Sequence, residues 1–244
     1  MDRARAVAAS RAEIQRLREQ PVSEVTPSRR DFAQYVATQK DDLAVIARIS
    51  RGDREQTISE LLDFATACDD AEVAALAVST TTGGLTIDAM AEIAAATTAP
   101  ILRDDLTLDP SQLYYARLHG ADAALFPAAD LDAAALHALV SVAGSLHMAA
   151  VIEIVRAADI ERAVQVPRAI LGLRCTAADG SLDVESTRQL ARQLPSRRTS
   201  IALPEVRSAA ECAALRGVCD AVIAGAVLRT APDVGAQLLQ LLNR

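Results

Sequence analysis

The chain has 244 residues, which favours one domain with a sizeable core. Its net charge of −7 argues against nucleic-acid binding, because phosphate recognition needs an excess of clustered lysine and arginine. No run of about 18 apolar residues occurs, so we predict no membrane-spanning segment. Aromatic residues make up only 2% of the chain against 51% hydrophobic residues, so the predicted core consists mainly of alanine, valine, leucine and isoleucine.

The cysteines and the first residues of the chain bear on its location. Cys68, Cys175, Cys212 and Cys219 have no CxxC spacing, which indicates neither a disulfide framework nor a zinc site. The charged first twenty residues lack the apolar segment of a secretion signal. We therefore expect a cytoplasmic protein.

The chain begins with a predicted amphipathic helix from Arg3 to about Glu19, which Pro21 and Pro27 end. A short helical piece starts at Asp31. After it, apolar strands and helices alternate to the end of the chain. The predicted strands are Leu43–Ala47, Ala74–Val78, Pro100–Leu102, Ala123–Phe126, Ala149–Ile154, Ala169–Leu173, Thr199–Leu203 and Ala221–Ala224. The predicted crossover and terminal helices are Thr57–Cys68, Ile87–Ala96, a helix capped at Asp109, Leu131–Gly144, Ala157–Val166, Val184–Leu194, Ala209–Leu215 and one from Val234 onward.

About eight strands alternating with helices in roughly 250 residues predict a (β/α)8 TIM barrel. We expect one domain over residues 1–244, with an N-terminal helical extension at 1–40 and the barrel at 41–244. The stretch from Pro100 onward is the clearest unit of the barrel. Its apolar strand runs into Arg103, Asp104 and Asp105, where such a strand is expected to end, so these charges are predicted to lie at the barrel mouth.

The residues of this stretch also carry a family resemblance. PILRDDLTLDPSQLYYARLHGADAAL, residues 100–125, resembles P-[VI]-L-R-K-D-F-x-x-D-x-x-Q-x-x-x-A-R-x-x-G-A-D-A of indole-3-glycerol phosphate synthase. Shorter similarities lie at Arg30-Asp31-Phe32, Val151–Ile154, Ile170–Leu173 and Asp220–Leu228. The resemblance implies a (β/α)8 barrel with an N-terminal extension. It also implies a cofactor-free reaction, in which carboxyphenylaminodeoxyribulose phosphate loses carbon dioxide and water as the indole ring closes.

The chain departs from the family pattern where the resemblance places catalytic groups. The glutamate and lysine of the first-strand motif A-E-[IV]-K correspond to Val45 and Ala47, and the third-strand lysine to Asp104. The sixth-strand asparagine corresponds to Arg174. In the seventh strand, Ala202-Leu203-Pro204-Glu205-Val206 stands for S-E-S-G-I, so serine and a phosphate-binding glycine are lost. The fifth-strand glutamate is kept as Glu153, and one glycine of the phosphate cradle as Gly225.

Glu153 and Asp104 are the predicted catalytic residues. Glu153 acts either as a general base or as a retained carboxylate that pairs with Arg174. Asp104 and Asp105 form either a carboxylate pair, in which repulsion raises one pKa, or a set of solvated acids in a capping loop. The predicted substrate- or anion-binding residues are Arg174, Arg103, Arg48, Ser50 and Gly225.

Other candidate residues have a structural interpretation. The polar loop Ser79–Gly84 is either a substrate contact or turn chemistry. His119, His137 and His147 are predicted to be structural, and no metal site or cofactor is predicted. Cys175 is interpreted as a small buried residue.

Three functional hypotheses remain open. The first is a divergent paralogue that has lost the ring closure and binds or transforms another anionic molecule, anthranilate-derived or sugar-phosphate-like, at the barrel mouth. If active, it would be a cofactor-free lyase or decarboxylase. The second is a catalytically inactive barrel that acts as a binding or complex subunit, with a protein partner or as a homodimer. The third is the parent enzyme of tryptophan biosynthesis.

Overall fold

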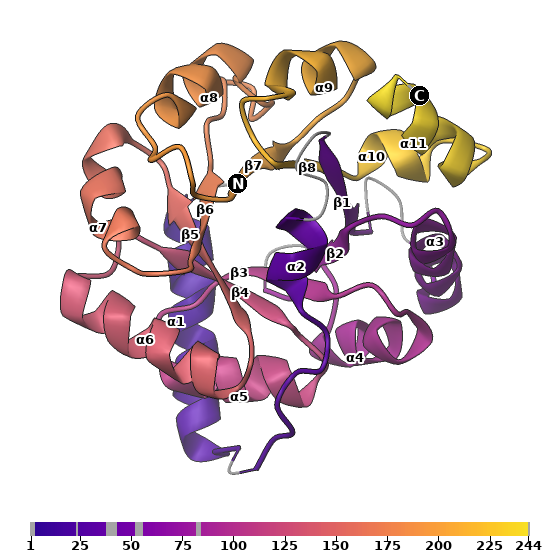
Figure 1. The fold of residues 1–244 in the computed structure, drawn as a ribbon. Coiled ribbons are helices and arrows are strands. Elements are labelled where there is room, and N and C mark those ends of the chain that lie inside the picture. Colours follow the sequence, from indigo (N-terminus) through magenta and orange to yellow (C-terminus); the bar gives the residue numbers. More distant parts are fainter. Residues whose placement is uncertain (1–2, 23, 38–42, 52–55, 82–83, 244) are drawn as a thin grey trace.

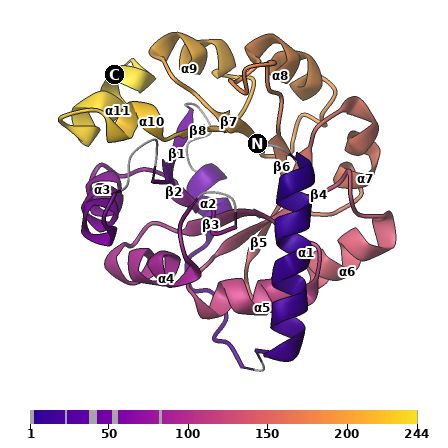
Figure 2. The ribbon, with the colours of Figure 1, turned by 180° about the vertical axis from the view of Figure 1, so that it is seen from behind.

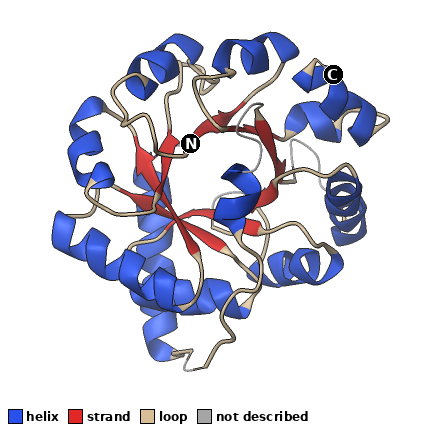
Figure 3. Cartoon of the chain, viewed as in Figure 1, coloured by secondary structure: helices blue, strands red, loops and turns tan. Residues whose placement is uncertain are grey.

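The computed structural model describes residues 3–22, 24–37, 43–51, 56–81 and 84–243. Its strands close into a parallel barrel in sequence order, and the last strand pairs with the first (Figure 1). The strands are β1 (Ala44–Ile49), β2 (Ala75–Val78), β3 (Ile101–Leu106), β4 (Ala123–Pro127), β5 (Ala149–Ile154), β6 (Ile170–Leu173), β7 (Ser200–Glu205) and β8 (Ala221–Ala224). Figure 3 shows them as a central ring surrounded by helices. The predicted (β/α)8 TIM barrel is confirmed.

Two helices precede the barrel, α1 (Arg3–Glu19) and α2 (Phe32–Ala37). The other helices are α3 (Ile58–Asp70), α4 (Ile87–Ala96), α5 (Pro110–Leu118), α6 (Ala133–Ser145), a 3₁₀ turn (Ala157–Asp159), α7 (Ile160–Val164), α8 (Val184–Ala191), α9 (Ala209–Leu215), α10 (Ala226–Arg229) and α11 (Val234–Leu242). The expected boundary near residues 38–42 and part of the predicted loop at 82–83 lie outside the described residues. Within the described ranges, no helix is long and apolar enough to span a membrane.

Short polar side chains fix where most of the crossover helices begin. The predicted cap Asp109 accepts the backbone N–H of Ser111, Pro110 follows at the first helical position, and Gln112 completes a capping box. Gly120 ends this unit with a φ of +95°, and an added Cβ there would lie 2.3 Å from Ala94 Cβ. Only glycine fits such a turn against α4.

Alternate residues of each strand face opposite sides, which divides the core into two layers. Ile46, Leu102, Leu125, Val151 and Ile223 belong to the cluster inside the barrel. Their sequence neighbours belong to a larger cluster between the strands and the surrounding helices. The predicted aliphatic, alanine-rich core therefore fills both layers.

The two N-terminal helices lie at opposite ends of the barrel. Phe32 and Val36 of α2 are fully buried against the interior cluster at the end where the strands begin. Seen from behind, α1 crosses the other face and runs down beside α5 (Figure 2). The first turn of α1 thereby reaches the C-terminal ends of the strands, where barrels of this type carry their sites.

Three strands run past their predicted ends because their charged residues stay in the sheet. β1 continues through Arg48 to Ile49. β3 continues through Asp104 and Asp105, and β7 continues through Pro204 to Glu205. The pairing register shifts in β3 and β7, between Arg103 and Leu106 and between Ala202 and Glu205. Such irregularities redirect side chains at barrel rims. The prediction that β3 ends before its charges is wrong, because those charges are paired within the fold.

Candidate functional site

Inward-facing polar residues gather at the C-terminal ends of the strands, which form the barrel mouth. They come from neighbouring and opposite strands: Arg48 on β1, Asp104 on β3, Glu153 on β5, Arg174 after β6, and Glu205 on β7. Each of these five strands contributes one because the inward positions recur at every second residue. The structure therefore brings together both predicted catalytic residues and two of the predicted anion-binding arginines.

Asp104 lies at the centre of this group, between two guanidinium groups. Arg48 Nη2 donates to Asp104 Oδ2, and Arg174 Nη2 donates to Oδ1 at 3.1 Å. Arg174 Nε also donates to Oε1 of Glu153. The pairing of Glu153 with Arg174, one of the two expected roles of this glutamate, is thus present in the structure.

The series of ion pairs extends beyond these residues at both ends. Arg3 of α1 donates to Glu153 Oε2 at 2.8 Å and also to Asp130, which lies in the β4–α6 loop. At the other end, Arg48 Nη1 donates to Glu205 Oε1 at 3.2 Å. We call the full series the mouth ion-pair chain, and its members in spatial order are Asp130, Arg3, Glu153, Arg174, Asp104, Arg48 and Glu205.

Burial of the mouth ion-pair chain is deepest at its centre. The Glu153 side chain is 0% exposed and Asp104 5%, whereas Arg3 is 34% exposed and Glu205 24%. Burial by itself lowers the pKa of the Arg174 guanidinium, but Asp104 and Glu153 raise it overall. Each buried charge therefore has an opposite charge against it, as burial of ions requires.

The carboxylate of Glu205 occupies the position at the end of β8 where an anion was expected. Its Oε2 accepts the backbone N–H of Ala226 at 3.0 Å. A Cβ added to Gly225 would lie 2.8 Å from the same oxygen, so only glycine leaves room for this carboxylate. Gly225 therefore leaves space at the end of β8, and the carboxylate of Glu205 occupies that space.

Arg103 does not join the mouth, which corrects the expectation that the three charges after Leu102 lie there together. Its guanidinium is buried on the outer face of β3, where it donates to Glu13 of α1, to Asp105 at 3.1 Å and to Thr80 at 3.0 Å. Arg103 therefore anchors α1 to the barrel, and its nitrogens are used by this anchor.

Asp104 and Asp105 do not form a carboxylate pair, because they face opposite sides of β3. Asp105 accepts the hydroxyl groups of Ser79, Thr80 and Thr81. Burial alone would raise the pKa of Asp105, but Arg103 and these hydrogen bonds lower it overall. Of the two alternatives, the carboxylate pair is absent and the solvated acids are also wrong, because both side chains are buried. The described part of the Ser79–Gly84 loop serves as turn and anchor.

Ser50 lies just beyond β1, and its hydroxyl accepts from Arg229 Nη1 at 3.1 Å. This contact ties the β1 end to α10. The role of Ser50 in anion binding stays a prediction.

The strand register shows which residues of β1 can contribute to the mouth. Val45 and Ala47 both lie in the outer layer, whereas Ile46 lies in the interior and Arg48 in the mouth. Two catalytic residues separated by one position must both face inward. Val45 and Ala47 therefore do not face the mouth, and the charged side chain that β1 places there is Arg48.

The cysteine thiols and histidines lie apart from the mouth chemistry. Burial raises the pKa of Cys68 and Cys219 to about 12 and that of Cys212 to about 11, so these thiols are unreactive. Burial also raises the pKa of Cys175. Nδ1 of His119 forms a hydrogen bond of 2.8 Å with the Tyr115 carbonyl oxygen. In the residues that the structure describes, no cluster of three or more histidine, cysteine or acidic side chains is arranged to hold a metal ion.

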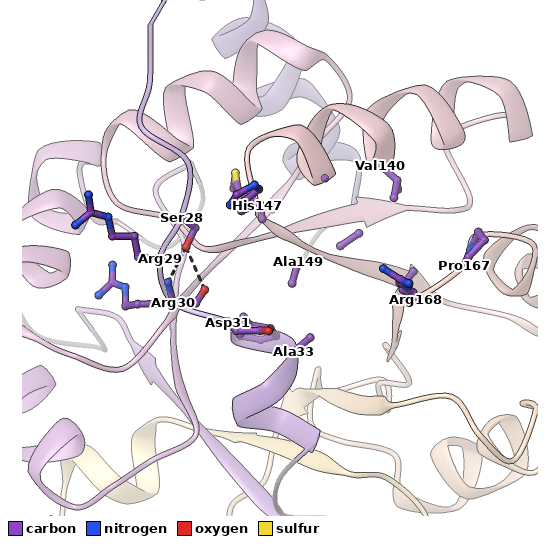
Figure 4. Close-up of a pocket in the computed structure, with 15 residues that line it drawn as sticks. Ser28, Arg29, Arg30, Asp31, Ala33, Val140, His147, Ala149, Pro167 and Arg168 are labelled. Carbon is purple, nitrogen blue, oxygen red and sulfur yellow. Dashed lines mark hydrogen bonds between the residues drawn. The ribbon is translucent and has the colours of Figure 1, made fainter.

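A cleft of about 510 Å³ lies at the opposite end of the barrel from these charges. Segment 28–33 forms one wall, and residues around His147 and Arg168 form the other (Figure 4). Arg30, on the first wall, is bound to Asp122 at 2.8 Å. None of the predicted site residues lines this cleft, so we do not identify it as the functional site.

The fold and the mouth define an eight-stranded α/β barrel of the class that places its functional residues at the C-terminal ends of the strands. The family model for indole-3-glycerol phosphate synthase matches residues 1–241. The chain belongs to the indole-3-glycerol phosphate synthase family.

Individual relatives agree with this assignment. The chain is 31% identical over 235 residues to an indole-3-glycerol phosphate synthase from Roseiflexus sp. (strain RS-1), covering 90% of this chain and 87% of the relative. It is 37% identical over 163 residues to the synthase of Roseiflexus castenholzii. That match covers 65% of this chain and 60% of the relative. A tryptophan biosynthesis protein TrpCF from Yersinia pestis is 29% identical over 226 residues, 90% of this chain and 47% of that protein.

Proposed function

We propose that this protein is a family member that does not carry out the ring closure, and that its mouth instead binds a small molecule with an anionic group. The observation that carries the proposal is the mouth ion-pair chain. In this series, the predicted catalytic carboxylates Asp104 and Glu153 form ion pairs with the predicted anion-binding residues Arg48 and Arg174.

The state of the acid position supports loss of the parent reaction. Both oxygens of Asp104 accept hydrogen bonds from guanidinium groups, so neither is free to deliver a proton to a substrate. Both oxygens of Glu153 are likewise engaged, by Arg174 and Arg3. A positioned acid or base commonly contributes about 10²–10⁴-fold in rate, so two blocked groups remove most of the acceleration.

Anion binding is supported by the surroundings of Glu205. A guanidinium group, a backbone N–H and a missing Cβ surround its carboxylate, and this set of donors suits any oxyanion of similar size. Glu205 is also 24% exposed and can leave its place. We infer that an anthranilate-like carboxylate or a sugar phosphate binds by exchanging with it.

A turnover assay tests the first half of the proposal. Carboxyphenylaminodeoxyribulose phosphate is incubated with the protein, and indole fluorescence is followed beside the synthase of Roseiflexus castenholzii as positive control. We expect no product from this protein. Turnover by the wild type that is lost in Glu153→Gln would contradict this half of the proposal. The protein would then be an indole-3-glycerol phosphate synthase, as its relatives are named.

A binding assay tests the second half. A non-reactive analogue of the same phosphate ester is titrated calorimetrically against the wild type and Glu205→Gln. The variant keeps the shape of the side chain but removes the competing charge, so we expect affinity to rise about tenfold, as a charged hydrogen-bond partner is gained. Arg48→Gln is expected to abolish binding, and the exposed Arg207→Gln serves as control. No binding by any of these proteins would favour the inactive barrel that serves as a subunit of a complex.

A further inference from the structure

A second polar cleft lies at the end of the barrel opposite the mouth, between the loop that leads into β7 and the turn before β8. Its volume is about 540 Å³, a size that holds a small molecule. A hollow of about 240 Å³ adjoins it and shares Arg192 and Gly217 with it. We call both together the basic cleft, defined by Arg188, Arg192, Arg198, Arg216 and Asp220.

The basic cleft has a strong excess of positive charge, in a protein whose net charge is −7. Its defining residues are four arginines and one acid. The acid, Asp220, already accepts the Ser200 backbone N–H at 2.8 Å. Within the described residues, Arg188, Arg192 and Arg198 form no ion pair with a carboxylate. The cleft therefore differs from the mouth, where each arginine has an acidic partner.

Two of these arginines are desolvated without full compensation. Among the described residues, Arg198 donates to three backbone carbonyls, those of Val164 at 3.0 Å, Val166 at 2.9 Å and Ala169 at 2.8 Å, and burial lowers the pKa of its guanidinium. Arg188 has a buried Nε with no hydrogen-bond partner. A buried donor that lacks a partner costs free energy, which an incoming acceptor restores.

We propose that the basic cleft is a binding site for a phosphate group, either free or carried by a small phosphorylated molecule. Four arginines line the two adjoining hollows, and the planar fork of a guanidinium group matches the oxygens of a phosphate. The volume, which suits a single small molecule, favours a small ligand over a polymer. The site is separate from the mouth and does not depend on the function proposed there.

Calorimetric titration of the whole chain with inorganic phosphate and with ribose 5-phosphate tests this site. We expect binding that weakens as ionic strength rises, because the guanidinium groups near the surface are screened by salt. Arg188→Gln combined with Arg192→Gln should weaken it about tenfold or more, since two charge-assisted donors are lost. Arg207→Gln, an exposed arginine after β7, is expected to leave it unchanged. Arg48→Gln is expected to remove any binding at the mouth while binding at the basic cleft persists. Far-UV circular dichroism checks that every variant is folded.

The outcomes separate clearly. Equal affinity for both probes assigns the cleft to the phosphate group alone, and tighter binding of the ester assigns it to a phosphorylated metabolite. The proposal is overturned if neither probe binds at millimolar concentration, if the double variant binds as well as the wild type, or if only Arg48→Gln loses binding. Tighter binding of a short oligonucleotide than of either probe would also overturn it.

Discussion

Restoring the family's lysine at the centre of the mouth should destabilise this protein. The substitution is Asp104→Lys, at a side chain that is 5% exposed and accepts from both Arg48 and Arg174. The new ammonium group would stand between two guanidinium groups, in a place built for a carboxylate. The family residue is therefore incompatible with this mouth as it stands.

The size of the effect follows from the two contacts. Opposite charges about 4 Å apart attract by about 4 kcal/mol at an effective dielectric of about 20, and reversing one charge turns both attractions into repulsions. Side-chain movement and water entry reduce such values, and removing one partner of a buried pair costs about 3–5 kcal/mol in practice. We expect Asp104→Asn to cost about 3 kcal/mol and Asp104→Lys more than about 5 kcal/mol, which approaches the whole stability of a typical domain.

A second substitution makes this expectation specific. Arg174→Asn restores the family's asparagine and removes one of the two cations beside the new lysine. The double variant should therefore be more stable than the sum of the single effects predicts, by at least about 1 kcal/mol. The lysine would then face Glu153, whose partner Arg174 has gone.

Urea denaturation followed by far-UV circular dichroism measures the free energy of unfolding of the wild type and the variants. Arg18→Ala is the control, because its pair with Asp109 is 3.3 Å long and the arginine is 71% exposed. Such a surface pair contributes less than about 1 kcal/mol. If Asp104→Lys costs no more than the control, or if the double variant is additive, the mouth charges are not coupled and the reasoning fails.

Three further expectations concern other parts of the chain. Arg3→Ala removes a partner of Glu153 and should speed amide hydrogen exchange in the first turn of α1, while α11, distant from this contact, exchanges unchanged. The folded pKa of Asp105 lies below its ordinary 3.8, so its contribution is present above that pH and is lost as the pH falls through the folded pKa. The free energy of unfolding of the wild type should therefore fall more steeply below pH 3.8 than that of Asp105→Asn, and parallel curves would contradict this. Cys68, Cys212 and Cys219 should not react with a thiol reagent at pH 8 in the native protein but should react in urea, because burial raises the pKa of these thiols to about 11 or 12.

The barrel itself could be predicted from the sequence because each strand and helix carries its own local signal. Asp109, Pro110 and Gly120 mark the limits of one helix without any tertiary information. The same local reading placed Asp104 and Glu153 at strand ends, and both lie in the mouth. Strand ends at one edge of a parallel barrel must meet, so this part of the site follows from topology.

The partners of these residues could not be predicted in the same way. Arg3 is 150 positions from Glu153, and its contact depends on how α1 crosses the barrel. Arg103 is the neighbour of Asp104 in sequence but faces α1, because strand residues alternate between two sides. Along β1, Arg48 faces the mouth and Ala47 faces the helices, a difference that the motif comparison alone did not give.

The arginines at the two ends of the barrel differ in whether carboxylates pair with them. This difference bears on which ligands each end can accept. The mouth ion-pair chain has four carboxylates and three guanidinium groups, so an added anion raises its negative charge unless a carboxylate such as Glu205 leaves. In the part of the chain that the structure describes, Arg188, Arg192 and Arg198 of the basic cleft form no ion pair with a carboxylate, so an anion would be attracted to them directly. Mouth binding should therefore depend on exchange within the protein, and an anion with no other recognition features should prefer the basic cleft.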